Sequence, residues 1–382
     1  MSEVGAPGPS GPALRRNWAV YDTNDVTEMF EVPLYSDANF TTLLRRPDWP
    51  FDLLPTLPHP LSQGVHLALV ARMRWCAPHP EWKPGVPTDE AAHHGGSIDD
   101  EIAALVALIY GVRCRSGGFN RHWYRDDDGT FSDPLGHPDE FNHVPPVWVA
   151  PPIGREMLPS LKKDAALLDG ISFLESLQSI PTDDVIVLIR AARLYSNAVW
   201  IADSDPNLAW IQLVSAVEAV ATHHARTEPR WKRVELAMPK VWKLLAEVGR
   251  DHAELVGSEL AHLANSTARF LTFLEDYAPG PPEVRPVGHQ LDWEDLRSAF
   301  RQIYGYRSRA LHDGTPFPDP MCEPARAFDD GVIVEAPYWI DSRSGTSVWR
   351  AEVVPMYLHL FEYIARSALL SWWHQRAAGS KP

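Results

Sequence analysis

Cysteine is scarce in this sequence of 382 residues, which contains three cysteines, Cys76, Cys114 and Cys322, and no Cys-x-x-Cys pair. This scarcity excludes a disulfide-stapled scaffold and a cysteine-rich zinc module. Free thiols are typical of reducing compartments, and the Gly/Pro/Ser-rich first residues do not have the pattern of a signal peptide. We therefore predict a cytoplasmic protein.

Long apolar runs and basic charge are scarce as well. The longest clean apolar run, residues 102–112, is shorter than the roughly 20 residues that span a bilayer, and residues 353–373 are interrupted by His359, Glu362 and Arg366. We therefore predict no membrane span. The 35 Lys and Arg stand against 50 Asp and Glu, giving a net charge of −15. That balance disfavours a protein that binds nucleic acid through a broadly basic surface, but it does not exclude a small local basic site.

Apolar residues and proline are abundant. Apolar residues make up 45% of the chain, enough for a sizeable core, and the length suggests about two domains. The 35 prolines predict long punctuated loops. We divide the chain into a disordered leader (residues 1–16), an N-terminal domain of unassigned fold that mixes helix and loop (residues 17–164), and a helical domain (residues 165–382).

The N-terminal domain has one well-marked helix, at residues 98–112. Acidic residues occupy its first turn, and Gly117-Gly118 follows as a stop. Residues 65–73 fit either a helix or a strand. Three arginines form a local basic patch, for which a solvated loop is favoured over an RNA contact: Arg113, Arg115 and Arg121.

Helical patterns dominate after residue 160. Expected helices cover residues 183–201, a segment beginning at Pro206 with Ser204 or Asp205 as its cap, and residues 231–248, 253–277, 292–311 and 353–375. Residues 332–334 and 347–349 are expected to pair as a hairpin that turns near residues 342–345. The predicted fold class is therefore mainly α: a helical bundle with a long loop or hairpin insertion.

The helix expected at residues 292–311 carries the most informative residues. Arg307 lies in line with its apolar stripe, and an arginine there requires a partner or a ligand. His312 follows five residues later, so the two side chains differ by ~140° around an ideal helix and by ~7.5 Å along it. The pair is therefore expected to flank a shared cleft, or to meet its copy across a two-fold interface.

These residues resemble a known family. The string Tyr304-Gly305-Tyr306-Arg307-Ser308-Arg309-Ala310-Leu311-His312-Asp313-Gly314 is similar to the R-x4-H motif of the HEPN superfamily, in its Apea-like branch. Residues 209–218 are similar to the family's early helix, which bears a glutamate, here Glu218, in an apolar face. The resemblance covers about residues 180–377.

The resemblance implies a homodimer in which both motifs face one cleft and cleave RNA without a metal or other cofactor. Many such proteins act in toxin or anti-phage systems. In these roles His312 moves the proton of the ribose 2′-OH and Arg307 stabilises phosphate charge, chemistry that suits both side chains. Glu218, Ser308 and Tyr304 are the expected supporting residues, and Arg309 is the expected RNA contact.

Other interpretations stay open. Arg307 can be a structural partner of Glu218, His312 can bond the last carbonyls of its helix, and Arg309 can be a solvated residue. The chain is then a catalytically silent HEPN module that binds RNA, nucleotide or a protein, or an unrelated helical scaffold. In the leading hypothesis the N-terminal domain senses a trigger or restrains the nuclease, which implies a regulatory partner there.

Overall fold

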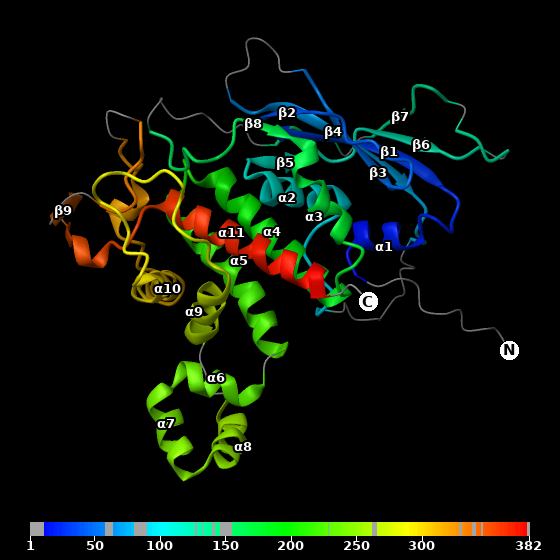
Figure 1. Cartoon of the computed structure of the whole chain (residues 1–382). Coiled ribbons are helices and arrows are strands. Elements are labelled where there is room, and N and C mark those ends of the chain that lie inside the picture. Colours follow the sequence, from blue (N-terminus) through cyan, green and yellow to red (C-terminus); the bar gives the residue numbers. More distant parts are fainter. Residues whose placement is uncertain are drawn as a thin grey trace. The chain divides into compact units, whose positions relative to one another are not determined.

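The computed structural model describes residues 11–57, 64–79, 90–126, 128–131, 133–139, 142–145, 155–227, 229–261, 266–327, 331–337, 341–344 and 347–379. The chain forms two compact units (Figure 1). The first unit comprises residues 1–150, 161–196 and 373–382, and the second comprises residues 151–160 and 197–372. About 49% of the chain is helical, and an antiparallel sheet is also present, so the fold is mixed α/β and the expected mainly helical class holds only in part.

The six-stranded sheet of the first unit is antiparallel throughout. Its order is β3-β4-β1-β6-β7, and β5 also pairs with β1. The strands are β1 (Glu28–Ser36), β3 (Phe51–Pro55), β4 (His66–Trp75), β5 (Cys114–Ser116), β6 (Arg121–Tyr124) and β7 (His137–Pro138). A separate parallel pair joins β2 (Asn39–Thr41) to β8 (Asp164–Ala166). The sheet in the N-terminal part was therefore not predicted from the sequence. The segment 65–73, left undecided between helix and strand, lies in strand β4 apart from its first residue.

The basic patch expected around Gly117-Gly118 does not exist as a solvated loop. Arg113 is fully buried and its Nη1 lies 2.8 Å from Asp37 Oδ2. Arg121 binds the buried Glu31 of β1 at 2.5 Å, and Arg72 binds the other oxygen of the same carboxylate at 2.7 Å. These arginines neutralise buried acids, because a buried carboxylate requires a cationic partner.

Helix α2 (Ile98–Tyr110) is buried along nearly its whole length, as its continuous apolar sequence requires. Ser97 and Asp100 form a capping box at its start, and Gly111 ends it in the left-handed region at φ 64°. The helix therefore ends at the first glycine after it, not at Gly117.

The predicted leader is wrong at its C-terminal end, since α1 (Ala13–Val20) is a helix. Its first backbone N–H groups, at Ala13 and Leu14, both donate to the carboxylate of Glu101 on α2 at 2.8 Å. His94 Nε2 lies 2.6 Å from the same carboxylate, and this hydrogen bond raises the pKa of His94. Residues 1–10 lie outside the described residues.

The second unit is built mainly from helices: α5 (Pro206–Thr227), α6 (Arg230–Ala237), α7 (Pro239–Val248), α8 (Arg250–Leu260), α9 (Ser266–Tyr277), α10 (Leu296–His312) and the first part of α11 (Leu358–Gly379). Two expected long helices are each divided. Pro239 begins a new helix after Met238, and residues 262–265, which separate α8 from α9, lie outside the described residues. Helix α11 begins at Leu358, after Pro355, and not at residue 353.

Helix starts with clear capping signals are confirmed. Asp205 Oδ1 accepts from the backbone N–H of Leu208 at 2.9 Å, and Pro206 occupies the first position of α5. Helix α4 (Thr182–Ile201) begins at Thr182 with Asp183 and Asp184 in its first turn. Residues of α4 belong to both units, so the compact units do not follow the boundary expected at residue 164.

The expected hairpin has a different partner. Strand β10 (Ser347–Arg350) pairs with β9 (Asp341–Ser344), whereas Ile333 forms an isolated bridge with Ala327. Strand β9 lies closer to β10 along the chain than Ile333 does, so closing the loop between β9 and β10 costs less conformational entropy. Short elements complete the chain: η1 (Leu167–Gly170), α3 (Ile171–Ser176), η3 (Asp319–Cys322) and η4 (Ala351–Val353). Within the described part, no helix is both long and apolar enough to cross a bilayer.

Candidate functional site

Helix α10 carries the R-x4-H string and lies beside α9 and α5 in the second unit (Figure 1). Asp295 is its N-cap and accepts from the backbone N–H of Ser298 at 3.4 Å. The expected start at Asp292 is wrong, because Asp292 instead closes a local turn by accepting from the backbone N–H of Glu294 at 2.9 Å. Five α10 residues form its buried face: Ala299, Phe300, Ile303, Tyr304 and Tyr306.

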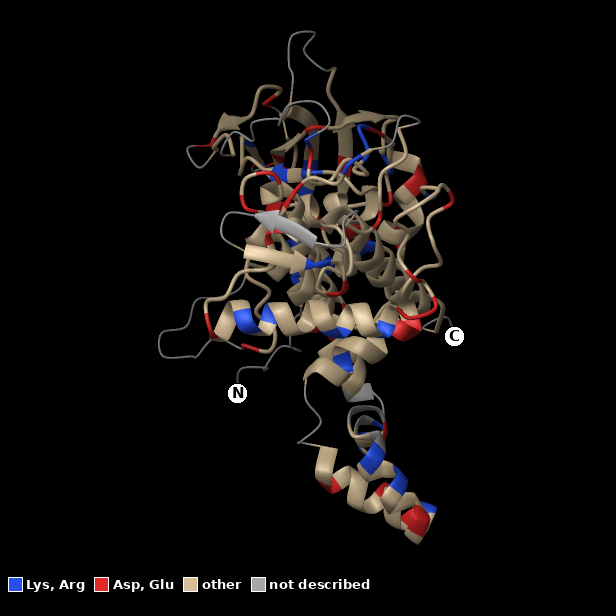
Figure 2. Cartoon of the chain, turned by 90° about the vertical axis from the view of Figure 1, so that its left-hand side faces the viewer, with Lys and Arg blue, Asp and Glu red and all other residues tan. Residues whose placement is uncertain are grey.

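Helix α10 is locally basic in an acidic protein. Between Leu296 and His312 it contains four arginines and no acidic residue: Arg297, Arg301, Arg307 and Arg309. Figure 2 shows blue basic positions spread along the helix, and acidic residues flank it, with Asp295 directly before its start and Asp313 directly after its end. The expectations for Arg307 and Arg309 concerned single residues, and the basic character of the helix as a whole was not predicted.

Arg307, Glu218 and Tyr304 form one interaction cluster between α10 and α5. Arg307 Nη2 lies 2.5 Å from Glu218 Oε2, and the Tyr304 hydroxyl donates to Glu218 Oε1 at 2.6 Å. The Arg307 guanidinium also lies over the Tyr304 ring, 5.7 Å from its centroid. The expected ion pair of Glu218 is present, but the two side chains are 17% and 18% exposed, so Glu218 is partly accessible and not buried.

The surroundings of Tyr304 determine its protonation state. Burial, followed by the hydrogen bond to Glu218, raises the pKa of Tyr304 to about 12. Tyr304 therefore stays protonated near neutral pH and acts as a donor that orients Glu218. Arg307 Nε is buried and has no hydrogen-bond partner within the described residues.

His312, Ser308 and Arg309 lie outside this cluster. His312 is exposed in the last turn of α10, and no described side chain forms a hydrogen bond or ion pair with it. The backbone N–H of Asp313 donates to Arg309 O at 2.8 Å and closes the helix. Arg309 is exposed, with its guanidinium 4.7 Å from the Tyr306 ring centroid. A single chain thus brings Arg307, Glu218 and Tyr304 together and leaves His312 accessible on its own.

Two residues of α9 next to the cluster were missed. The Ser266 side chain interacts with the Tyr304 hydroxyl and opposes the rise of its pKa. Arg269 Nη2 in turn donates to Ser266 Oγ at 3.0 Å. Nothing in the sequence marks these two residues, because only the packing of α9 against α10 brings them to Tyr304.

No group of three or more His, Cys, Asp or Glu side chains that could hold a metal ion occurs among the residues that the structure describes. The pair His223-His224 lies on α5, where His224 packs against Phe273 and Tyr277 of α9. No family model, no curated protein and no solved structure matches this chain. The residues of α10 and α5 themselves must therefore carry any functional argument.

Glu218→Ala is expected to lower the free energy of unfolding by about 1–3 kcal/mol, because Arg307 and the Tyr304 hydroxyl lose their shared acceptor. This is less than the ~3–5 kcal/mol typical of a fully buried pair, since both side chains are partly exposed. Urea unfolding followed by circular dichroism measures the difference. Glu275→Ala is the matched control, because it removes the α9 carboxylate that pairs with Arg297, another arginine of α10. Glu275 is more exposed than Glu218, so this change should cost about 0–1 kcal/mol. Equal losses in the two variants would contradict the role given to the cluster.

Proposed function

We propose that this protein is a metal-independent endoribonuclease of the HEPN type, a cytoplasmic effector of the toxin or anti-phage class. The observation that carries the proposal is the arginine-rich helix α10, with Arg307 held by Glu218 and Tyr304 and His312 exposed at the helix end. Arg297 and Arg307 are paired with Glu275 and Glu218, and the exposed Arg301 and Arg309 give local attraction to phosphate despite the net charge of −15.

The proposed reaction uses the nucleophile of RNA itself. The 2′-oxygen attacks the adjacent phosphorus, its proton passes to the His312 imidazole, and the bond to the 5′-oxygen of the next nucleotide breaks. The departing 5′-oxygen takes a proton from water and the His312 imidazolium returns its proton to water, so the products are a 2′,3′-cyclic phosphate and a 5′-hydroxyl. Arg307 donates to the phosphate oxygens as negative charge builds up on them.

Glu218 and Tyr304 are positioning residues in this scheme. Glu218 binds Nη2 of Arg307, and Tyr304 donates to the other oxygen of Glu218. Two hydrogen bonds to one carboxylate restrict its rotation, so the guanidinium is held in one orientation before RNA binds. Arg309, exposed within the motif, contacts the RNA backbone, and Ser308 assists Arg307 in binding the phosphate.

A homodimer follows from the separation of Arg307 and His312. Arg307 is held against Glu218 of α5, whereas His312 is exposed in the last turn of α10, so one motif alone does not surround a phosphate. We expect the full chain to be a dimer at micromolar concentration, measured by size-exclusion chromatography with light scattering. A monomer at every concentration would eliminate a cleft composed of two motifs.

One observation favours a second function. Glu218 already neutralises the charge of Arg307 within the chain, which lowers its attraction for phosphate. The second candidate is therefore a catalytically silent HEPN module that binds RNA, nucleotide or a protein partner. In either case we propose that the N-terminal part of the chain takes a regulatory partner or trigger.

RNA cleavage in the presence of EDTA tests the leading function. The full chain is expected to cleave single-stranded RNA with EDTA present, because the scheme uses no metal, and to leave DNA of the same sequence intact because DNA lacks the 2′-OH. Gel analysis should show 2′,3′-cyclic phosphate ends. Cleavage that stops with EDTA and returns with Mg²⁺ would contradict the scheme. RNA binding without cleavage would support the silent module instead.

A further inference from the structure

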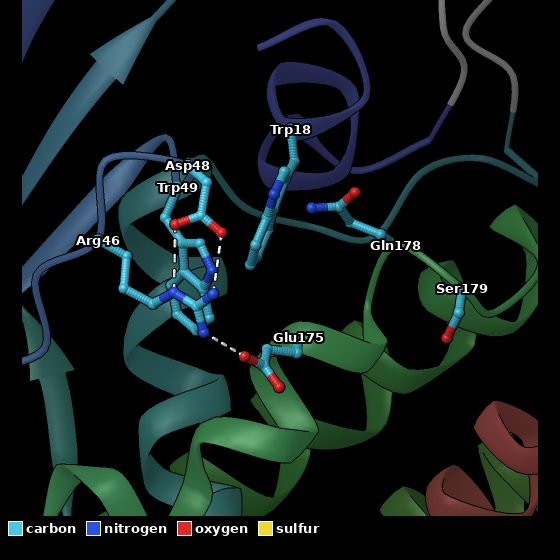
Figure 3. Close-up of a pocket in the computed structure, with 7 residues that line it drawn as sticks. All are labelled: Trp18, Arg46, Asp48, Trp49, Glu175, Gln178 and Ser179. Carbon is cyan, nitrogen blue, oxygen red and sulfur yellow. Dashed lines mark hydrogen bonds and ion pairs between the residues drawn. The ribbon is translucent and has the colours of Figure 1, made fainter. Parts of the chain in front are cut away.

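A pocket of about 310 Å³ lies within the first unit, and none of its lining residues belongs to α5 or α10. Three segments supply its lining (Figure 3): α1, the loop before β3, and α3 with the residues that follow it. Its lining residues are Trp18, Arg46, Asp48, Trp49, Glu175, Gln178 and Ser179. The volume falls at the lower end of small-molecule sites, where it suits one side chain or a metabolite of similar size.

Two indoles form a firm wall of this pocket. Trp18 and Trp49 are 5% and 2% exposed, and their ring centroids lie 4.9 Å apart. Phe51 packs against both rings, at 5.4 Å from Trp18 and 5.3 Å from Trp49. The wall is thus part of the aromatic core of the first unit, so a ligand meets a preformed surface.

The charged rim already holds a guanidinium of the chain itself. Arg46 donates through Nε and Nη2 to the two oxygens of Asp48, at 3.2 and 3.0 Å, and through Nη1 to Oε1 of Glu175. Its guanidinium carbon lies 5.3 Å from the Trp49 ring centroid. The pocket therefore stacks a planar cation on an indole and grips it with carboxylates, and Figure 3 shows these contacts.

The residues that line the pocket leave negative charge for a second cation. Asp48 and Glu175 bring two carboxylates against the single guanidinium of Arg46, which leaves one excess negative charge at the rim. Arg46 contacts Oε1 of Glu175, so Oε2 is left for another donor. The exposed side chains of Gln178 and Ser179 add hydrogen-bonding groups beside it.

We propose that this pocket binds a guanidinium group of a ligand, which packs against the accessible part of Trp18 and donates to Oε2 of Glu175. The ligand is either a small guanidine metabolite or an arginine side chain of a peptide, since both present the same planar cation. A guanidinium matches the site better than an ammonium group, because its flat, weakly hydrated face packs against an indole while an N–H donates to the remaining Oε2 of Glu175.

Isothermal titration of the full chain with agmatine and with N-acetyl-argininamide tests the proposal. At least one probe is expected to bind, and raised NaCl should weaken the binding because an exposed carboxylate contributes to it. Glu175→Gln should weaken the binding about tenfold or more, the effect of losing one charge-assisted hydrogen bond. Glu175 is exposed, so this variant should stay folded, which circular dichroism checks.

Matched controls make the result decisive. N-acetyl-citrullinamide has the same shape as N-acetyl-argininamide but no charge, and it should not bind detectably. Glu90→Gln removes an exposed carboxylate of the same unit outside the pocket and should leave affinity unchanged. Tight binding of agmatine points to a metabolite, and binding of the blocked arginine alone points to a peptide. No binding of either cationic probe, equal binding of the citrulline compound, or equal affinity in Glu175→Gln would each overturn the proposal.

Discussion

His312→Ala is expected to reduce the rate of RNA cleavage by about 10²–10⁴-fold, because the 2′-OH then loses the group that takes its proton. Arg307→Ala should cause a loss of similar size, since a permanent donor to the developing phosphate charge disappears. Single-turnover cleavage of a labelled single-stranded RNA by the full chain measures both rates. His312 is exposed and has no described side-chain partner, so His312→Ala should unfold at the same temperature as the unmodified chain.

Arg301→Ala is the matched control for these variants. Arg301 is an exposed arginine on the same helix outside the R-x4-H string, so its loss should weaken RNA affinity but leave the maximal rate nearly unchanged. Arg307→Ala also breaks the ion pair with Glu218, and Arg307→Lys separates the two effects by keeping the charge. Cleavage at an unchanged rate in His312→Ala would reject the catalytic assignment.

Glu101→Ala is expected to destabilise the first unit by about 3–5 kcal/mol. Glu101 is fully buried and accepts from the backbone N–H groups of Ala13 and Leu14, and it also lies 2.6 Å from His94. Its removal leaves two backbone donors and a partly buried imidazole without their acceptor. Urea unfolding monitored by tryptophan fluorescence measures the loss, because Trp18 on α1 belongs to the aromatic core.

Glu101→Gln provides the graded comparison. The amide keeps one acceptor oxygen for the start of α1 but loses the charge, so the loss of stability should be smaller than in Glu101→Ala. Glu90→Ala removes an exposed carboxylate of the same unit and should change stability by less than about 0.5 kcal/mol. If Glu101→Ala is as stable as Glu90→Ala, the carboxylate does not anchor α1.

Local signals predicted much of the helical structure. Acidic residues in the first turn mark the start of α4, and Asp205 with Pro206 marks the start of α5. These starts were predictable because capping depends on neighbours within one turn. The sheet was missed for the opposite reason. Strand β1 pairs with strands that lie far along the chain, and its central Glu31 breaks the apolar pattern, although Arg72 and Arg121 neutralise it in the fold.

At the candidate sites too, features set by neighbouring residues were predictable and features set by distant residues were not. The stripe position of Arg307 predicted a partner or a ligand, and the structure gives it Glu218 as a partner. The helix α1 was not predicted, because the group that caps it, Glu101, is 88 residues away from Ala13. The pocket of Trp18, Arg46 and Glu175 likewise joins three distant segments, and none of these residues stands out in its own surroundings.

Residues 373–382 belong to the first unit, although the rest of that unit lies before residue 197. Trp373 packs on Phe173 with ring centroids 5.0 Å apart, and Arg376 Nε binds Asp184 at 2.7 Å, a contact that spans 192 residues. During synthesis on a ribosome, the first unit therefore gains these contacts with α3 and α4 only after residues 373–379 have left the exit tunnel. A chain cut before Trp373 would lose contacts made by residues about 200 positions earlier, so a late truncation is expected to weaken the first unit as well as the second.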